Sequence, residues 1–174
     1  AFESIPESDG NYLEIGIGNG YAILQMATHQ FAAGQCYGLD ISEKMVEVAS
    51  RRMADLNNVH LEAGNFLDWS PERDIRFDLI FSMEVFYYFP DVAAGINKAV
   101  SLLNEGGRLL VLVNFHRGNP ECYSWPDDLG VPMVLWSKEE YRAAFETAGM
   151  SDISQCTLPS KSDKSITLST MGIK

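Results

Sequence analysis

The stretch from Asn11 to Gly20, NYLEIGIGNG, constrains the fold more than any other part of this 174-residue chain. An apolar run ends in three glycines at alternate positions, Gly16, Gly18 and Gly20, and an amphipathic segment begins at Tyr21. Glycines at such a place allow a positive φ and let a ligand approach the main chain closely. The helix start beyond them offers unpaired N–H groups and the positive end of its dipole. We interpret the stretch as strand, tight turn and helix, with a nucleotide-type cofactor site at the edge of a parallel sheet.

The spacing of these glycines separates two classes of cofactor. The dinucleotide fingerprint G-x-G-x-x-G has its last glycine where the helix packs on the strand. Tyr21 occupies that place here, and the acidic Glu14 stands two residues before the first glycine. A bulky side chain at that place is awkward for the pyrophosphate of a dinucleotide bound over the helix start. A nicotinamide-dependent oxidoreductase is therefore an alternative that the spacing disfavours. A non-catalytic, partner-binding subunit of the same fold is a further alternative, but it would need neither the glycine loop nor Asp40.

Composition narrows the class of protein. The length suits one domain over residues 1–174. With 24 acidic and 13 basic residues and a net charge of −11, a nucleic-acid partner is not expected. Three cysteines without C-x-x-C spacing, Cys36, Cys122 and Cys156, argue against a metal site or disulfides and for a reducing cytoplasm. No apolar run approaches the roughly 20 residues that span a bilayer, so no membrane association is expected.

Strand and helix periodicities alternate along the chain, which is typical of a doubly wound α/β fold with a mostly parallel sheet and helices on both faces. Ser42 is expected to cap one helix, Gly34 to end another, and Ser137 with Glu140 to form a capping box. Gly149 is expected to end that last helix. Strands are expected over residues 13–17, 36–41, 59–62, 77–81, 108–113, 151–158 and 165–171. The last two strands are expected to form a hairpin linked by residues 159–161. Helices are expected over residues 21–33, from Ser42 up to Asn57, over 92–103 and after Ser137.

Residues 114–136 differ from the rest, because prolines and glycines alternate there with aromatic residues. A loop of this length in a compact domain is usually functional or disordered. We expect it to be a lid over the substrate.

Four segments, taken in order, resemble the class I S-adenosylmethionine (SAM) dependent methyltransferases, of the small-molecule kind often labelled type 11. Residues 13–20 resemble motif I, 38–42 the ribose-binding end of strand two, 64–66 the adenine-side loop, and 77–86 the strand-four segment, followed by 103–107 before strand five. The resemblance implies a Rossmann-like seven-stranded sheet in the order 3-2-1-4-5-7-6 with strand seven antiparallel. It also implies methyl transfer from SAM to a small-molecule acceptor, with S-adenosylhomocysteine (SAH) as product.

The cofactor site implied by this resemblance draws on several strand ends. Asp40, at the end of the second strand, would accept hydrogen bonds from the ribose hydroxyls. Glu14 would face the amino group of SAM or pair with a neighbouring backbone, and Phe66 would contact adenine or belong to the core. The full set expected is Glu14, Gly16, Gly18, Asn19, Gly20, Asp40, Ile41, Gly64, Asn65, Phe66, Ser82 and Met83.

Methyl transfer from SAM is an in-line displacement that an enzyme accelerates mainly by positioning donor and acceptor. A general base is needed only where the acceptor is protonated. The candidates for such chemistry are Glu84, Tyr88 and His116. Alternatively, Glu84 is simply solvated, Tyr88 packs against other aromatic residues, and His116 is a histidine of a surface loop. Related enzymes carry helices ahead of motif I, whereas only residues 1–12 precede the first strand here. Such a helical cap is therefore either missing from this chain or replaced by the lid. The sequence identifies neither the acceptor nor the oligomeric state.

Overall fold

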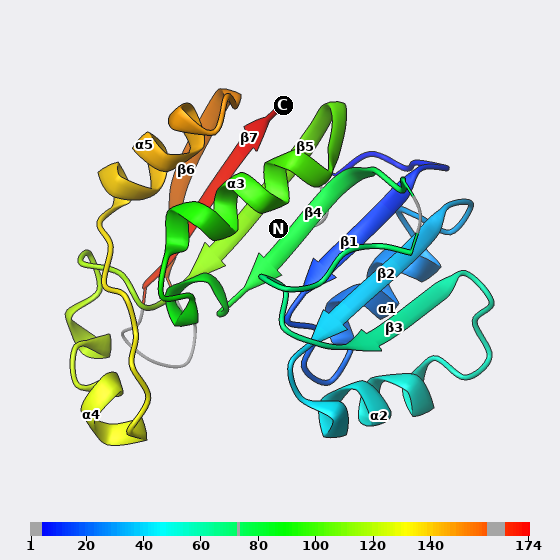
Figure 1. The fold of residues 1–174 in the computed structure, drawn as a ribbon, viewed down its shortest axis with the longest axis horizontal. Helices are drawn as coiled ribbons and strands as arrows, with labels where there is room; N and C mark the ends of the chain where they lie inside the picture. Colours follow the sequence, from blue (N-terminus) through cyan, green and yellow to red (C-terminus); the bar gives the residue numbers. More distant parts are fainter. Residues whose placement is uncertain (1–4, 73, 160–165) are drawn as a thin grey trace. The chain divides into compact units, whose positions relative to one another are not determined.

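The structure is a computed structural model that describes residues 5–72, 74–159 and 166–174. Seven strands form one sheet in the order β3-β2-β1-β4-β5-β7-β6 (Figure 1), which confirms the order expected from the resemblance. The elements are β1 (Asn11–Ile15), α1 (Tyr21–Thr28), β2 (Gln35–Asp40), α2 (Glu43–Arg52), β3 (Val59–Ala63), β4 (Phe77–Met83), η1 (Phe86–Tyr88), α3 (Val92–Leu102), β5 (Leu103–Val113), η2 (Pro120–Cys122), α4 (Trp125–Leu129), α5 (Lys138–Thr147), β6 (Ser151–Pro159) and β7 (Ile166–Ile173).

The chain divides into two compact units, of which the first comprises residues 5–81 and 102–107. Its strands β1, β2 and β3 pair in parallel, with Ile15 opposite Leu39 and Asp40 opposite Ala63. Parallel pairing places the carboxyl ends of these strands at one edge, where the glycine loop and the loops after β2 and β3 begin. Gly38 lets α1 pack closely, because a Cβ there would lie 2.7 Å from the side chain of Ile17 and 2.9 Å from that of Ile23.

The second unit comprises residues 82–101 and 108–174. In it β7 runs antiparallel to both β5 and β6, as expected. Helix α5 lies along β6 and β7 (Figure 1) and starts with the expected capping box of Ser137 and Glu140. Gly149 follows its end with φ 86°, the left-handed conformation that ends a helix. The core of the unit is aromatic and aliphatic, with Phe86, Ile96, Phe115, Tyr141 and Phe145 fully buried or nearly so.

Three expected boundaries are wrong by four residues or more. Helix α2, expected up to Asn57, ends at Arg52 with Met53 as its C-cap, and the Leu56 N–H then bonds to the Met53 carbonyl in a turn. Helix α1 ends at Thr28 with His29 as its C-cap, well before Gly34, because the Phe31 N–H bonds back to the Met26 carbonyl and winds the chain into turns. Gly34 serves a different contact, since a Cβ there would lie 2.1 Å from the carbonyl oxygen of Gly10. Strand β5 begins at Leu103 directly after α3, whereas the strand was expected only from residue 108.

The expected lid, residues 114–136, is not a plain loop, because it contains the short helices η2 and α4. Its two ends are joined by the Arg117 N–H, which donates to the Trp136 carbonyl over 2.9 Å. Of the expected hairpin link, residues 159–161, Pro159 is the last residue of β6, and residues 160–161 lie outside the described part of the chain.

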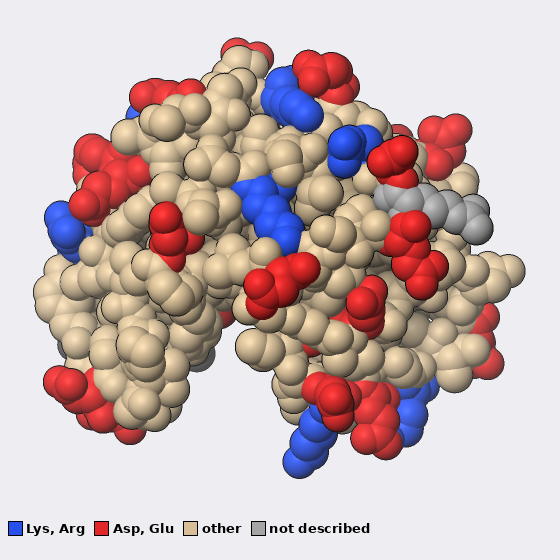
Figure 2. All heavy atoms as spheres, in the orientation of Figure 1, with Lys and Arg blue, Asp and Glu red and all other residues tan. Residues whose placement is uncertain are grey.

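The charged surface is dominated by acids. Figure 2 shows acidic side chains spread over the face drawn, and among the described residues there no continuous basic patch appears. No helix within residues 5–72, 74–159 and 166–174 has the length and apolar character needed to cross a membrane.

Candidate functional site

The glycine loop joins β1 to α1 in a conformation that only glycine adopts without strain. Gly16, Gly18 and Gly20 have φ values of 79°, 52° and 78°. The loop is fastened to β2, because the Gly16 N–H donates to the Leu39 carbonyl over 2.7 Å. A Cβ on Gly20 would lie 2.9 Å from the Ala49 side chain, whereas a Cβ on Gly18 would meet nothing within 4 Å. Gly18 is therefore the point of the loop that a ligand can approach.

Asp40 ends β2 beside this loop. One carboxylate oxygen accepts the Gly18 N–H over 2.9 Å, and the other accepts the Ser42 N–H over 2.9 Å. Each oxygen keeps a lone pair for a further donor. The carboxylate thus holds the loop in shape and still offers acceptors for a pair of hydroxyl groups.

Two exposed apolar side chains accompany these polar groups. Ile41 directly follows Asp40 and is 78% exposed, and Tyr21 directly follows the glycine loop and is 62% exposed. Large apolar side chains left open beside a polar loop fit the walls of a ligand site. Tyr21 was absent from the expected set. Tyr21 could have been added to the expected set from its position alone, because it is the first helical residue after the last glycine of the loop.

Glu14 is buried in the same unit, with 4% of its surface exposed. Its carboxylate accepts a hydrogen bond from the Tyr12 hydroxyl over 3.1 Å and another from the Ile23 N–H in the first turn of α1. Burial raises its pKa to about 8. Because Gly20 provides no side-chain cap for α1, Glu14 caps the helix from the strand. This is the structural pairing that the sequence left as an alternative.

The loop after β3 uses its side chains locally. Asn65 accepts the Leu67 N–H over 3.1 Å and donates to Asp68 over 2.8 Å, so both ends of its amide are engaged within the turn. Phe66 is 3% exposed and belongs to the core. Gly64 donates its N–H to the Asp40 carbonyl over 2.8 Å, which brings the start of this loop next to the end of β2.

In the second unit, Glu84 follows the end of β4 with φ 61°, a strained conformation for a residue with a Cβ. Its carboxylate accepts the Asn114 N–H over 2.7 Å and the Tyr87 hydroxyl over 3.0 Å. Burial raises the pKa of Glu84. Of the strand residues before it, Ser82 is fully buried and Met83 is half-exposed. Glu84 therefore ties the end of β4 to the end of β5.

Comparison with known proteins identifies the chain's relatives. A family model described as a methyltransferase domain matches residues 6–146. The 27-O-demethylrifamycin SV methyltransferase of Amycolatopsis mediterranei is 33% identical over 161 residues, covering 85% of this chain and 58% of that protein. Malonyl-[acyl-carrier protein] O-methyltransferase 1 of Ilyobacter polytropus is 33% identical over 99 residues, covering 57% of this chain and 36% of that protein. The chain belongs to the methyltransferase-domain family. It spans less than two thirds of the length of either relative.

Solved structures agree on the fold of this methyltransferase domain. A chain in the complex between the Haloferax volcanii Trm112 methyltransferase activator and a methyltransferase aligns with a TM-score of 0.84 and 26% identity, covering 97% of this chain and 84% of that one. The N-methyltransferase NodS of Bradyrhizobium japonicum, in complex with SAH, aligns with a TM-score of 0.75 and 21% identity, covering 95% and 78%. The architecture is that of the class I SAM-dependent methyltransferases, whose cofactor is SAM. The open space at Gly18 and the spare acceptors of Asp40 fit such a cofactor.

Two aromatic candidates of the methyltransferase domain occupy different environments. His116 is 2% exposed, and its Nδ1 accepts the Gly118 N–H over 3.1 Å while its Nε2 lies 2.9 Å from the Ile166 carbonyl oxygen. This assigns the proton to Nε2 and leaves neither nitrogen open to a ligand, which favours a structural role over that of a base. Because His116 is buried, the alternative expectation that it is a surface histidine is wrong. Tyr88 is partly exposed, and its ring centroid lies 4.5 Å from that of Tyr87.

The buried carboxyl of Glu14 leads to a prediction about pH. Since the folded-state pKa, about 8, lies above the ordinary value of 4.5, the folded methyltransferase domain holds a proton that the unfolded chain releases. The resulting stability is fully present below pH 4.5 and falls by on the order of 1 kcal/mol per pH unit as the pH rises through about 8. Glu14→Gln should remove this slope. Urea unfolding of both proteins from pH 5 to 9 measures it, and identical slopes would show that Glu14 does not titrate in this range.

Proposed function

We propose that this chain is the catalytic domain of a SAM-dependent methyltransferase that acts on a small-molecule acceptor. The observation that carries the proposal is the Asp40 carboxylate, which holds the open Gly18 backbone and keeps acceptors free. In this proposal the glycine loop receives the methionine part of SAM, Asp40 accepts the ribose hydroxyls, and Tyr21 and Ile41 provide apolar walls. The bound sulfonium supplies an activated methyl group. The three unpaired cysteines support a reducing, cytoplasmic setting for the enzyme.

The chemical contribution of the chain is mainly positioning. Methyl transfer needs the acceptor atom in line with the donor, and holding the two reactants in place supplies much of the acceleration. An acceptor that loses a proton on methylation needs a base, and we propose for this role the carboxyl of Glu84, whose pKa is raised by burial. Tyr88 is proposed to contact the acceptor.

Acceptor specificity is proposed to come from the lid, residues 114–136. Its Val134 N–H donates to the Tyr87 carbonyl over 2.8 Å, so the lid is attached to the segment that carries Glu84. Tyr123, Leu129 and Val131 of the lid expose large apolar surfaces. Such surfaces suit an acceptor with an apolar body, because its burial would be favourable.

Titration calorimetry with SAM, SAH and NAD tests the cofactor. We expect SAM and SAH to bind and NAD to give no heat. Tight NAD binding with no SAM binding would establish the oxidoreductase alternative instead. A screen of metabolites for SAH release then separates an enzyme from a non-catalytic SAM-fold subunit, which would bind SAM without turnover.

A pair of glycine substitutions gives a sharper test of the loop. Gly18 and Gly106 both have positive φ and both have open space at the Cβ position. Each change to alanine should therefore lower the free energy of unfolding by about 1 kcal/mol. Only Gly18→Ala should also weaken SAM binding, by at least about tenfold, because its methyl group would occupy the space where a ligand approaches the backbone. Equal SAM affinity in the two variants would place the cofactor elsewhere.

A further inference from the structure

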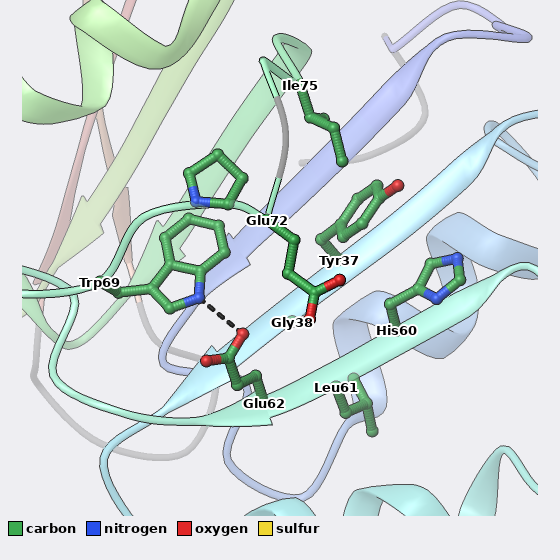
Figure 3. Close-up of a pocket in the computed structure, with 9 residues that line it drawn as sticks. Tyr37, Gly38, His60, Leu61, Glu62, Trp69, Glu72 and Ile75 are labelled. Carbon is green, nitrogen blue, oxygen red and sulfur yellow. Dashed lines mark hydrogen bonds between the residues drawn. The ribbon is translucent and has the colours of Figure 1, made fainter.

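The first unit contains a pocket that none of the residues assigned to SAM lines. It lies over β2 and β3 and is lined on its other side by Trp69, Pro71, Glu72 and Ile75 (Figure 3). Its volume is about 450 Å³, within the range of small-molecule sites. Along β2, Tyr37 precedes Asp40 by three residues, a rise of about 10 Å. The lining residues Gly38 and Glu62 come within two positions of Asp40 and Gly64, so the pocket neighbours the expected SAM site but shares no residue with it.

Aromatic rings held by their neighbours form the walls. The Tyr37 ring stacks on His60 with centroids 4.9 Å apart and an interplanar angle of 25°, and meets the Phe77 ring edge-on at 5.5 Å. The Trp69 indole stands across the pocket from Tyr37 (Figure 3), and its N–H donates to the Glu62 carboxylate over 2.7 Å. Because these contacts fix the rings in the absence of a ligand, the walls are already in place for binding.

The charges facing the pocket are negative. Glu62 and Glu72 line it, whereas no Lys or Arg of the described residues does. The Glu72 side chain extends between Trp69 on one side and Tyr37 and His60 on the other (Figure 3). Within residues 5–72, 74–159 and 166–174, no ion pair to Glu72 is formed. Among the described residues, this carboxylate beside aromatic rings therefore has no cationic side chain paired with it.

We propose that this pocket binds a small organic cation of the quaternary ammonium class. The faces of tryptophan and tyrosine attract such a cation, and its weak hydration lets it leave water for an apolar wall. The two carboxylates attract its positive charge, and an anion would be repelled by both. A small inorganic cation is disfavoured, because the aromatic walls would not replace its water ligands. The proposal concerns residues outside the SAM site and holds whether or not methyl transfer is demonstrated.

Choline and its neutral isostere 3,3-dimethylbutan-1-ol provide the test, since they share a shape and differ in charge. Calorimetry and tryptophan fluorescence at pH 8 and low ionic strength should show saturable binding of choline, and binding of the alcohol at least about tenfold weaker. Equal affinities, or no saturable choline binding, would overturn the proposal. Preference for a peptide carrying trimethyllysine over choline would overturn the assignment to a free small molecule.

Variants connect the binding to this pocket. Glu72→Gln keeps the side-chain shape and removes the charge, so choline binding should weaken by about 5- to 30-fold. Trp69→Leu should weaken it to a similar extent and remove the fluorescence change. Glu7→Gln, which removes another exposed carboxylate outside the pocket, should leave choline affinity unchanged. Thermal unfolding reports whether each variant is folded. Equal weakening by Glu72→Gln and Glu7→Gln would show a general charge effect and refute the pocket.

Discussion

Asp40→Ala should weaken SAM binding by about 1–3 kcal/mol, a loss of roughly 5- to 150-fold in affinity. The proposed ribose hydroxyls would lose their acceptor. The Gly18 and Ser42 N–H groups would lose the carboxylate that each contacts over 2.9 Å. The second loss matters because the Gly18 N–H belongs to the loop that receives the ligand. The substitution therefore changes both a direct contact and the shape of the site.

Calorimetry with SAM and SAH measures this effect, and two controls interpret it. SAM is a cation, so the loss of any negative charge reduces its attraction to the protein slightly. Asp55→Asn removes an exposed carboxylate in the first unit, and its effect gives this background. Asp40→Asn keeps an oxygen acceptor and should bind with intermediate affinity. An Asp40→Ala affinity equal to that of Asp55→Asn would show that Asp40 does not contact the ribose.

The part of the fold that could be predicted depends on local patterns. Helix α2 begins after Ser42 and α5 after the Ser137 capping box, because a cap is a property of adjacent residues. The strand order followed from the resemblance, which carries information that periodicity lacks. The end of α1 was missed because Gly34 was taken as its C-terminal cap, whereas the helix already ends at Thr28 and the Phe31 N–H bonds back to the Met26 carbonyl. Gly34 is required where the Gly10 carbonyl passes, 24 positions away in the chain, and no neighbouring residue indicates this.

The candidate site likewise has features that the sequence predicts and features that depend on contacts elsewhere in the chain. Asp40 beside the glycine loop could be anticipated, since parallel strands end at one edge, and the hydrogen bond to Gly18 agrees with that placement. The environment of His116 could not be anticipated, because the residues that enclose it come from β7 and from its own turn. Asn65 illustrates a different difficulty. Its amide forms hydrogen bonds with Leu67 and Asp68 of its own turn, which the sequence pattern did not indicate. Which of the expected residues contact SAM stays a prediction.

Glu84→Ala should lower the free energy of unfolding by about 2–4 kcal/mol. The Asn114 N–H and the Tyr87 hydroxyl would both lose the carboxylate that accepts their hydrogen bonds. The alanine would also retain the strain of a left-handed φ of 61°. Glu84→Gly should recover about 1 kcal/mol of this loss, because glycine adopts the conformation freely. Urea unfolding at pH 7 compares the variants, and equal stability of the alanine and glycine variants would show that the strain is absent.

Glu84→Gln separates the structural role of this carboxyl from a chemical one. The glutamine oxygen can still accept a hydrogen bond from Asn114, so the variant should be more stable than Glu84→Ala. The rate of SAH release then decides the role. A base must bind and release a proton, which an amide cannot do, so a proton-transfer role predicts a loss of about 10²- to 10⁴-fold in the rate of methyl transfer. A variant with normal stability and a normal rate would show that Glu84 acts by joining β4 to β5. Methyl transfer would then depend on positioning alone, because His116 has both ring nitrogens engaged by backbone groups.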